Sequence, residues 1–390
     1  MELKPGYKQT DVGVIPEEWS VRRLGEIGES LIGLTYSPEN VKSDGLLVLR
    51  SSNVAEGELR FEDNVFVDVD VPERIILRKD DILICVRNGS RGLIGKCAKI
   101  DERAEGMTFG AFMAVFRTDF HNLVYHQFQS EILKRQIHEH LGATINQITN
   151  ASLHSFRIPF PRNEAEQRAI AGALSDVDAL IGALNQLIAK KCNLKQAAMQ
   201  QFLTGQTRLP GFRGEWGLRT VAEIAEVSKG TQLHGSETNS YGSFPHFNGG
   251  ISPSSYTNKS NAPANTIIIS EGGNSCGYVQ LVPESFWCGG HCYTVMPKNI
   301  DNRFLYHALK TQQAAIMGLR VGSGLPNIQK TALAAFKLRI PSEHAEQTRV
   351  AEVLSDMDAE LAALEQRLTK TRTLKQGMMQ ELLTGRIRLV

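Results

Sequence analysis

Two long stretches of the chain carry apolar residues at alternating steps of four and three. Both seams are regular, and they consist of Ile170, Leu174, Val177, Ile181, Leu184 and Ile188, and of Val350, Leu354, Met357, Leu361, Leu364 and Leu368. Such spacing is typical of a coiled-coil seam, so each stretch is predicted to be a helix that needs a partner helix. Proline precedes each stretch and glycine follows it, at Pro161 and Gly205 and at Pro341 and Gly385, which are start and stop signals.

The first of these helices is predicted to run from about Glu164 to Leu203. At about 1.5 Å per residue such a helix is near 60 Å long, which suits a spacer better than a compact core. The apolar steps change after Lys191 and after Thr371. This change predicts a break or a local difference in packing at both places.

The two helical stretches are copies of each other. Aligning Ala165 with Ala345 gives a gapless match in which AEQ, LSDVD or LSDMD, LKQ, MQ, LTG and RL recur at an offset of 180 residues. The register extends backward to pair Phe156 with Phe336, Leu153 with Leu333, Ile148 with Ile328 and Gly142 with Gly322. Repetition on this scale indicates two half-molecules built on one plan. The nearest equivalent surface for either seam is the other copy, and a pseudo-twofold axis relating the pair requires antiparallel helices.

The segments before each helix, residues 19–161 and 216–341, differ in sequence but share a mixed pattern. Short runs rich in Val, Ile and Leu are predicted strands, among them LLVLR, DILICV and GKCAKI in the first segment and TIIISEGG, YVQLV and YTVMP in the second. Helical patterns follow at 123–140 and 303–319. Each half is therefore predicted to be α+β, with a glycine-rich loop after one strand, at Gly89–Gly92 and at Gly272–Gly277.

Composition excludes several classes of protein. The 390 residues carry a formal net charge of +1 and contain no apolar run of the roughly 18 to 20 residues that a membrane span needs. Six scattered cysteines do not form a disulfide framework, and the polar start MELKPGYKQTDVG lacks a secretory signal, so we expect a cytoplasmic protein. Residues 179–214 and 302–342 contain basic side chains but no Asp or Glu. Such stretches fit either a surface that faces a polyanion or an ordinary solvated face.

Several patterns that suggest catalysis or metal binding are incomplete. The run Gly89–Lys96 is one residue too long for a phosphate-binding loop, and Cys97 stands where that loop needs Ser or Thr. Cys288, His291 and Cys292 have the wrong spacing for a zinc site and lack a second pair, so buried thiols are favoured. The carboxylates of SDVD and SDMD diverge on a helix, which suits a helix surface or a docking contact better than acid–base chemistry.

One arrangement combines all these features. Five elements follow one another twice: PEEW or GEW, a variable segment, a G-QI-L-F-IP or G-NI-L-F-IP pattern, AEQ-LSD-D and LKQ-LTG. This order resembles the specificity subunit of type I restriction-modification systems over essentially the whole chain. The resemblance implies an α+β chain with two globular target-recognition domains separated by two long antiparallel coiled-coil helices, with internal pseudo-twofold symmetry. The expected boundaries are 1–161 for the first domain, 162–206 for the first helix, 207–341 for the second domain and 342–390 for the second helix.

The resemblance also implies partners and a division of labour. We expect double-stranded DNA with a bipartite site, one half for each domain, two modification (methyltransferase) subunits, and restriction (translocase and endonuclease) subunits. This chain would be a non-catalytic reader without a cofactor, with S-adenosylmethionine, ATP and Mg²⁺ on the partner subunits. The alternative from another class is a coiled-coil adaptor that joins two protein-binding modules without DNA.

Candidate DNA contacts follow from position and chemistry. Arginine can pair with guanine, and Asn or Gln with adenine, each pair contributing about 1 to 3 kcal/mol of discrimination. The candidates of the first half are Arg50, Ser51, Asn53, Arg87, Asn88, Ser90, Arg91, Asn146 and Gln147. Those of the second half are Asn248, Asn274, Ser275, His291, Asn327 and Lys330. Any one of them could instead cap a loop.

Overall fold

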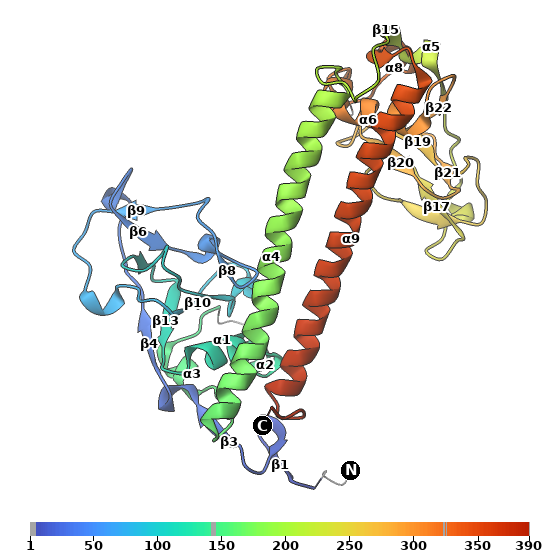
Figure 1. The fold of residues 1–390 in the computed structure, drawn as a ribbon. Coiled ribbons are helices and arrows are strands. Elements are labelled where there is room, and N and C mark those ends of the chain that lie inside the picture. Colours follow the sequence, from blue (N-terminus) through green and yellow to red (C-terminus); the bar gives the residue numbers. More distant parts are fainter. Residues whose placement is uncertain (1–4, 142–145, 323, 325, 390) are drawn as a thin grey trace. The chain divides into compact units, whose positions relative to one another are not determined.

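The computed structural model describes residues 5–141, 146–322, 324 and 326–389, and it divides the chain into two compact units. Unit 1 contains the residues up to Leu184 together with those from Leu368 onward, and unit 2 is Asn185–Arg367. Each unit contains one mixed domain of strands and short helices, and part of each of two long helices (Figure 1). The predicted α+β class is confirmed for both halves. The predicted partner of Gly322, Gly142, lies outside the described residues.

The long helices are α4, Glu164–Phe202, and α9, His344–Leu382. The first agrees with the predicted Glu164 to Leu203, whereas the second ends before the predicted residue 390 because Gly385 terminates it. The repeated glutamine of AEQ fixes each start, because its side-chain amide donates back to the carbonyl of the preceding proline: Gln167 to Pro161 at 2.7 Å and Gln347 to Pro341 at 2.9 Å. Each helix is followed by a glycine with positive φ, +72° at Gly205 and +71° at Gly385, the left-handed conformation that ends helices.

The two helices pack antiparallel in each unit. In unit 1, Ile170 and Leu174 near the start of α4 share a core with Met379 and Leu382 at the end of α9. In unit 2 the roles exchange, since Val350 and Leu354 near the start of α9 share a core with Leu203 after α4. Both helices continue without a break through the places where the apolar steps change. The packing does change there, because Leu194 and Leu374 are 48% and 58% exposed.

The domain of unit 1 is built on a four-stranded antiparallel sheet. Its order is β11 (Cys97–Lys99), β10 (Ile82–Cys85), β13 (Met113–Arg117) and β4 (Glu29–Ile32). Alternate residues of the central strands enter two different cores: Ile82 and Ile84 face the long helices, and Leu83 and Cys85 face a second sheet. Because both faces are covered, β10 is a continuous apolar run without polar alternation.

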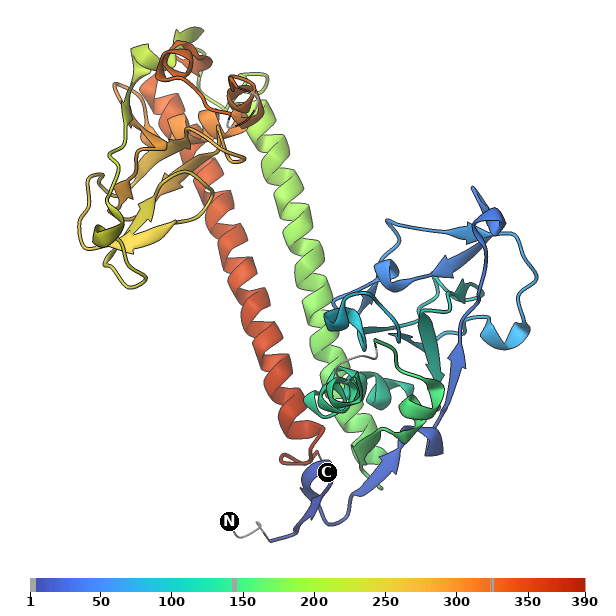
Figure 2. The same ribbon diagram turned by 180° about the vertical axis from the view of Figure 1, so that it is seen from behind.

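The second sheet and the smaller elements complete this domain. The second sheet has the order β12 (Thr108–Phe109), β6 (Leu46–Leu49), β9 (Phe66–Val67) and β5 (Val41–Lys42), with β12 and β6 parallel. The helices of this domain are α1 (His121–Gln129), α2 (Glu131–Leu141) and α3 (Asn150–Ser155). The domain also contains three strand pairs: β1 (Tyr7–Thr10) with β2 (Gly13–Pro16), β3 (Ser20–Arg23) with β14 (Arg157–Phe160), and β7 (Val54–Ala55) with β8 (Glu58–Leu59). Figure 2 shows the β1–β2 hairpin, in dark blue, beside the end of α9, where the Tyr7 hydroxyl donates to the Gly385 carbonyl at 3.0 Å.

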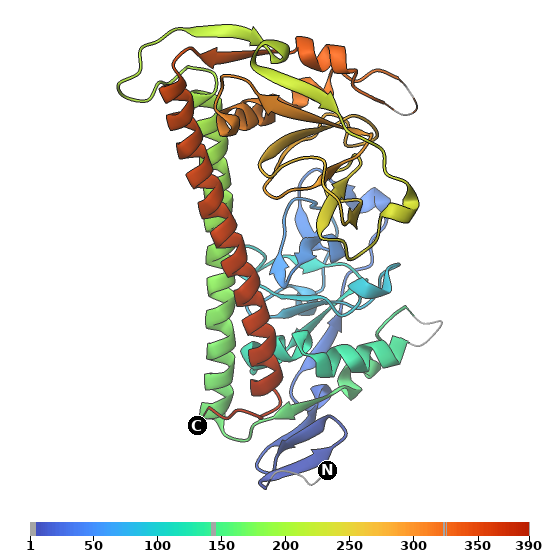
Figure 3. The same ribbon diagram turned by 90° about the vertical axis from the view of Figure 1, so that its right-hand side faces the viewer.

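The domain of unit 2 has the same plan. Its antiparallel sheet has the order β16 (Ala225–Lys229), β22 (Cys292–Pro297), β19 (Thr266–Ser270) and β20 (Val279–Val282), and its smaller sheet has the order β18 (Ser255–Thr257), β17 (Phe244–Phe247) and β21 (Trp287–Cys288). The remaining elements are β15 (Trp216–Thr220), α5 (Val221–Ile224), α6 (Asn302–Thr311), α7 (Gln313–Met317), α8 (Lys330–Ala335) and β23 (Lys337–Pro341). β15 and β23 pair along their length beside the start of α9 (Figure 3). Both predicted helical stretches, 123–140 and 303–319, are split into two helices, at Ser130 and at Gln312.

A buried ion pair explains why AEQ and RL recur together. In unit 1 the Glu166 carboxylate is fully buried, accepts a hydrogen bond from the Trp19 indole at 3.1 Å and is paired through both oxygens with Arg388. Arg388 lies in the tail after α9, so the end of the second repeat is fixed to the start of the first. The hydrogen bond between the Arg388 guanidinium and the Glu166 carboxylate is the main cause that raises the pKa of Arg388 above its ordinary value.

Unit 2 contains the same cluster with the repeats exchanged. Glu346, 1% exposed, accepts from the Trp216 indole at 3.4 Å and from two nitrogens of Arg208 at 2.5 and 2.7 Å. Arg208 lies in the tail after α4. Each repeat therefore provides the glutamate of one cluster and the arginine of the other, which is the pseudo-twofold relation that the sequence predicts.

The second aspartate of SDVD and SDMD joins the two long helices. In unit 1 the Lys375 ammonium lies 2.6 Å from Asp178, and in unit 2 Lys195 pairs with Asp358. A buried histidine from the domain packs on the same helix turn in each unit, His126 beside Ser175 at 3.3 Å and His307 beside Ser355 at 3.4 Å. The LSD and LKQ repeats thus form one contact between both helices and the domain, in which Asp178 and Asp358 serve the packing of the chain itself.

Candidate nucleic-acid interface

Three chain segments meet at one exposed edge of the first domain. The end of β10, the end of β6 and the turn before β13 are joined by backbone hydrogen bonds from Val86 to the Phe112 carbonyl at 3.1 Å and from Gly110 to the Leu49 carbonyl at 3.0 Å. A fourth segment, Gly33, lies so close that a Cβ atom there would be 2.3 Å from the Phe109 carbonyl oxygen. Glycine is therefore required at this position for the segments to come together.

A pocket of about 560 Å³ opens at this edge. Its lining includes Tyr36, Arg50, Ser51 and Phe112. Phe112 is 56% exposed, and the Arg87 guanidinium lies over its ring, 5.0 Å from the ring centroid. Two of the predicted DNA contacts, Arg50 and Ser51, thus line a concave surface, and Arg87 lies beside it.

The three candidate arginines have different surroundings. Arg50 forms an ion pair with Asp63 at 2.8 Å. Arg91 donates to the Asn146 side chain at 3.2 Å and to the Leu141 carbonyl at 2.9 Å. Arg87 is exposed, and among the described residues no carboxylate forms an ion pair with it. Its donors are the least committed of the three.

The neighbouring polar candidates organise the same edge. The Asn88 amide donates to the Ser51 hydroxyl at 3.0 Å, and the Asn88 carbonyl oxygen accepts from the Ser90 backbone at 2.9 Å. Gln147 forms an isolated backbone bridge with Arg87. The structure therefore brings Ser51, Arg87, Asn88, Ser90 and Gln147 together on one surface, as a shared site requires.

Asn53 does not belong to this surface. Its side chain is fully buried, its oxygen accepts from the Arg50 backbone at 2.9 Å, and its amide donates to the Arg60 carbonyl at 2.9 Å. The group is committed to holding the loop after β6, so it has no donor or acceptor to offer a base. We therefore remove Asn53 from the candidate contacts and assign it the loop-capping role.

The second domain repeats the backbone hydrogen bonds that join the segments at Val86, Phe112, Gly110 and Leu49, and we call this arrangement the backbone frame. In the second domain the backbone N–H of Gly289 donates to the Phe247 carbonyl at 2.7 Å, and the backbone N–H of Glu271 donates to the His291 carbonyl at 2.9 Å. These two bonds correspond to those at Gly110 and Val86, so Asn248 occupies the place of Arg50 and His291 the place of Phe112. Gly230 repeats Gly33, because a Cβ atom there would lie 2.2 Å from the Gly289 carbonyl oxygen.

A family model described as the type I restriction modification DNA specificity domain matches residues 16–190 and, a second time, residues 213–372. The chain belongs to this family. The two matches contain the two equivalent frames, so the duplication seen in the structure is the duplication of the specificity domain.

Relatives agree with this assignment. A type I specificity subunit of Mycoplasma genitalium is 34% identical over 163 residues, which are 41% of this chain and 42% of the relative. One from Mycoplasma pneumoniae is 33% identical over 43% of this chain and 46% of its own length, so the chain spans less than half of these two relatives. A type I restriction enzyme specificity subunit of Methanocaldococcus jannaschii is 25% identical and matches 98% of this chain and 97% of its own.

The fold is also that of a solved member. The crystal structure of a type I restriction-modification system S subunit from M. genitalium superposes with a TM-score of 0.70 at 19% identity, over 98% of both chains. A second solved structure, from work on complex assembly and conformational transition of the type I system, has a TM-score of 0.54 at 16% identity over 96% of this chain and 99% of its own. At these identities the likeness concerns the fold alone.

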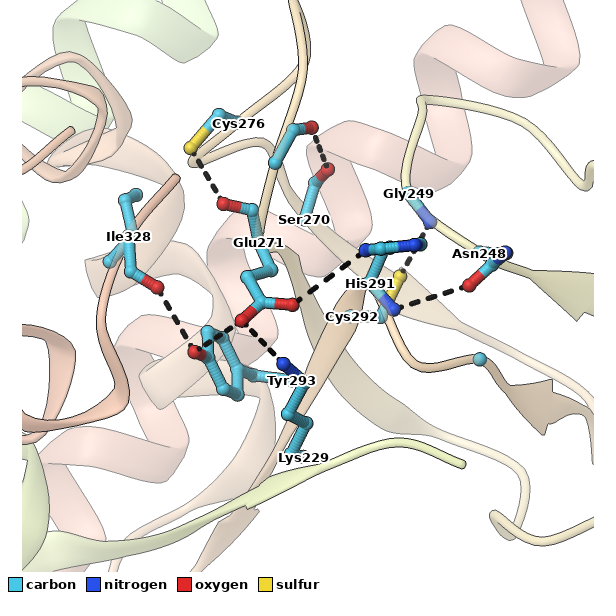
Figure 4. Close-up of polar contacts among 12 residues, drawn as sticks. Lys229, Asn248, Gly249, Ser270, Glu271, Cys276, His291, Cys292, Tyr293 and Ile328 are labelled. Carbon is cyan, nitrogen blue, oxygen red and sulfur yellow. Dashed lines mark hydrogen bonds and ion pairs between the residues drawn. The ribbon is translucent and has the colours of Figure 1, made fainter. Parts of the chain in front are cut away.

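Within this specificity chain, the second frame surrounds an acidic residue that the sequence analysis missed. Figure 4 shows the Glu271 carboxylate between Lys229, whose ammonium lies 2.7 Å away, the Tyr293 hydroxyl at 3.0 Å and His291 at 4.0 Å. Burial, with Glu271 next in importance, raises the pKa of Tyr293 to about 12. The Asn248 oxygen accepts from the His291 backbone at 3.2 Å. Two predicted contacts of the second half, Asn248 and His291, are therefore neighbours.

The other candidates of the second specificity domain lie on nearby loops. Asn274 is exposed, and the Ser275 hydroxyl is 3.4 Å from that of Ser270. The backbone of Asn327 bridges to Gly272, just as that of Gln147 bridges to Arg87. Lys330 is exposed at the start of α8. Arg50, Arg87 and Gln147 thus correspond in the backbone to Asn248, Gly272 and Asn327.

Neither a metal centre nor a membrane span is found in the described part of this specificity chain. Cys288 and Cys292 are both buried, and no group of three His, Cys, Asp or Glu side chains there could hold a metal ion. None of the described helices is long and apolar enough to cross a bilayer.

Phe112 and Glu271 were missed for a definite reason. A single Phe after Gly-Ala and a single Glu after an apolar strand look ordinary in the sequence. Only the register of β10 with β13, and of β19 with β22, places them beside the candidate contacts. The available signal was the glycine doublet before His291 and the Gly-Ala before Phe112, which mark a close turn.

Proposed function

We propose that this chain is the DNA sequence-specificity subunit of a type I restriction-modification complex. Each domain contacts one half of a bipartite DNA site, and the long helices connect the two domains. The observation that carries the proposal is the duplicated frame: one backbone arrangement occurs twice, with Arg50, Arg87 and Phe112 in one copy and Asn248, Gly272 and His291 in the other. A common scaffold with different polar side chains is what two different half-sites require.

Partner subunits complete the proposal. The chain is a non-catalytic reader, and two modification subunits and the restriction subunits supply the chemistry with S-adenosylmethionine, ATP and Mg²⁺. The complex acts in the cytoplasm. The proposed boundaries are 1–161 and 207–341 for the domains and 162–206 and 342–390 for the segments that contain the long helices α4 and α9.

Salt dependence separates this function from that of a protein adaptor. Binding that neutralises phosphates releases counterions, so the logarithm of affinity falls by about 0.9 for each phosphate contact and log unit of salt. We expect a steep slope for the assembled complex on DNA that contains its site. An adaptor that binds only proteins would show no such DNA binding.

Domain exchange tests the assignment of one domain to each half-site. Residues 20–160 are the natural segment, because β3 and β14 pair with each other at its two ends and Trp19 stays with Glu166. Replacing them by the same segment of another specificity chain should change one half of the methylated sequence, mapped in cells that carry the complete system. If both halves or neither half changed, the modular assignment would be refuted.

A further inference from the structure

We infer that Arg87 and Phe112 form one base-reading unit in the first domain, in which the phenyl ring orients the guanidinium toward a guanine of the half-site. The inference rests on the proposed DNA-specificity function. It adds Phe112 as a positioning residue and names the base that the first domain reads through Arg87.

Phe112 has the exposure of a contact residue and no role in the core. The residue is 56% exposed, although the flanking Met113 is fully buried. Its carbonyl accepts from both Val86 and Arg87 at 3.1 Å, so the turn that carries the ring is fixed to the end of β10. Its place in the lining of the pocket beside Arg50 and Ser51, rather than its exposure alone, makes it a candidate contact.

The ring restricts Arg87. The guanidinium lies 5.0 Å from the ring centroid, within the range of a cation–π contact. A flexible arginine loses less conformational freedom on binding when a planar surface already holds it. Among the described residues none accepts a hydrogen bond from the Arg87 side chain, so its N–H donors can meet the O6 and N7 acceptors of guanine in the major groove.

Competition among the arginines of this edge points to Arg87. Arg50 is neutralised in part by Asp63, and Arg91 donates to Asn146 and to the Leu141 carbonyl. Both would have to give up existing partners before they could contact a base. Arg87 keeps its donors, and its backbone bridge with Gln147 fixes where its side chain starts.

The second domain lacks this unit. Gly272 occupies the backbone position of Arg87, and His291 that of Phe112. The Arg87–Phe112 pair therefore accounts for a difference between half-sites without any change of backbone. Altering it should affect only the half-site that the first domain reads.

The test uses the full chain assembled with its partner subunits and DNA that carries its mapped site. Each guanine of the site is replaced in turn by 7-deazaguanine, which lacks the N7 acceptor, and affinities are compared for the wild type, Arg87→Ala, Phe112→Ala and Phe112→Tyr. Arg87→Ala should weaken binding to normal DNA about 5- to 150-fold, the range of a good bidentate pair. One deaza position should weaken wild-type binding by less than this, because the O6 acceptor is kept, and it should have no effect on Arg87→Ala.

The Phe112 variants test positioning. Phe112→Ala should reduce the effect of the same deaza position, whereas Phe112→Tyr, which keeps a ring, should restore it. Ile32→Ala is the matched control, because Ile32 is 52% exposed on β4 of the same unit, and it should bind like the wild type.

Other outcomes overturn the inference in recognisable ways. If Arg87→Ala weakened binding equally on all sequences and lowered the salt slope by about one contact, Arg87 would bind a phosphate and the guanine assignment would be wrong. If Phe112→Ala matched the wild type at every deaza position, the positioning role would be excluded. If the wild-type complex had no sequence preference at all, the proposed function itself would fail.

Discussion

Removing Arg388 should destabilise unit 1 and leave unit 2 unchanged. The Glu166 carboxylate is 0% exposed, and Arg388 pairs with both of its oxygens. In an Arg388→Met variant this buried charge keeps only the Trp19 indole as a side-chain donor among its described contacts. Breaking a buried pair by removing one partner costs about 3 to 5 kcal/mol, because the remaining charge stays desolvated. Arg388 is 25% exposed, so we expect the lower end, about 3 kcal/mol.

Amide hydrogen exchange measures this effect locally. A loss of about 3 kcal/mol should accelerate exchange that proceeds through opening of unit 1 by about 100-fold, since about 1.4 kcal/mol corresponds to a factor of ten. Peptides around Trp19 and the start of α4 should show it. Peptides around Trp216 and Glu346 are the internal reference, because they contain the equivalent cluster with its own arginine, Arg208.

A neighbouring arginine provides the matched control. Arg386 lies in the same tail, is 63% exposed and pairs only with the partly exposed Glu381 among its described contacts. Exposed pairs of this kind contribute about 0 to 1 kcal/mol, so Arg386→Met should leave exchange nearly unchanged.

A double variant decides whether the ion pair is the cause. Combining Arg388→Met with Glu166→Gln should cost less than the sum of the two single changes, because no unpaired carboxylate remains. Additive effects, or equal loss of protection in both units, would refute the reasoning that Arg388 acts through Glu166.

Two further predictions concern single side chains of unit 1. Burial, with a smaller effect of the Lys375 and Lys99 charges, lowers the pKa of His126 to about 3. Between pH 6.5 and 3 the unfolded chain therefore binds a proton that the folded chain excludes, and the free energy of unfolding falls as the pH falls. From pH 6.5 to 5, urea unfolding should show a His126→Gln variant losing about 2 kcal/mol less than the wild type, and parallel curves would contradict this. Gly33→Ala should destabilise the first domain by more than about 1 kcal/mol, because its Cβ would lie 2.3 Å from the Phe109 carbonyl oxygen. Gly92→Ala, which has open space around it, is the control and should not destabilise the domain. Equal melting temperatures of the two variants would refute the close approach at Gly33.

The sequence by itself determined the repeated parts of this protein. The seam spacing and the Pro and Gly signals placed the first long helix to within one residue at each end, and they placed the second between Pro341 and Gly385, because helix periodicity and termination are local properties. The gapless offset between the repeats required two equivalent halves, and the structure shows them as the exchanged clusters at Glu166 and Glu346. The sequence did not show that the glutamate of each cluster pairs with the arginine of the other repeat, since that contact joins residues over 130 positions apart.

The candidate interface was decided only by tertiary structure. Local composition selected Arg50, Arg87 and Asn248, but it also selected Asn53, which is buried and caps a loop. Phe112 and Glu271 were invisible in the sequence, because the strand register that exposes one and surrounds the other is set by long-range pairing. Helices form from near neighbours along the chain, whereas this edge is assembled from segments that meet only when the sheets close around their cores.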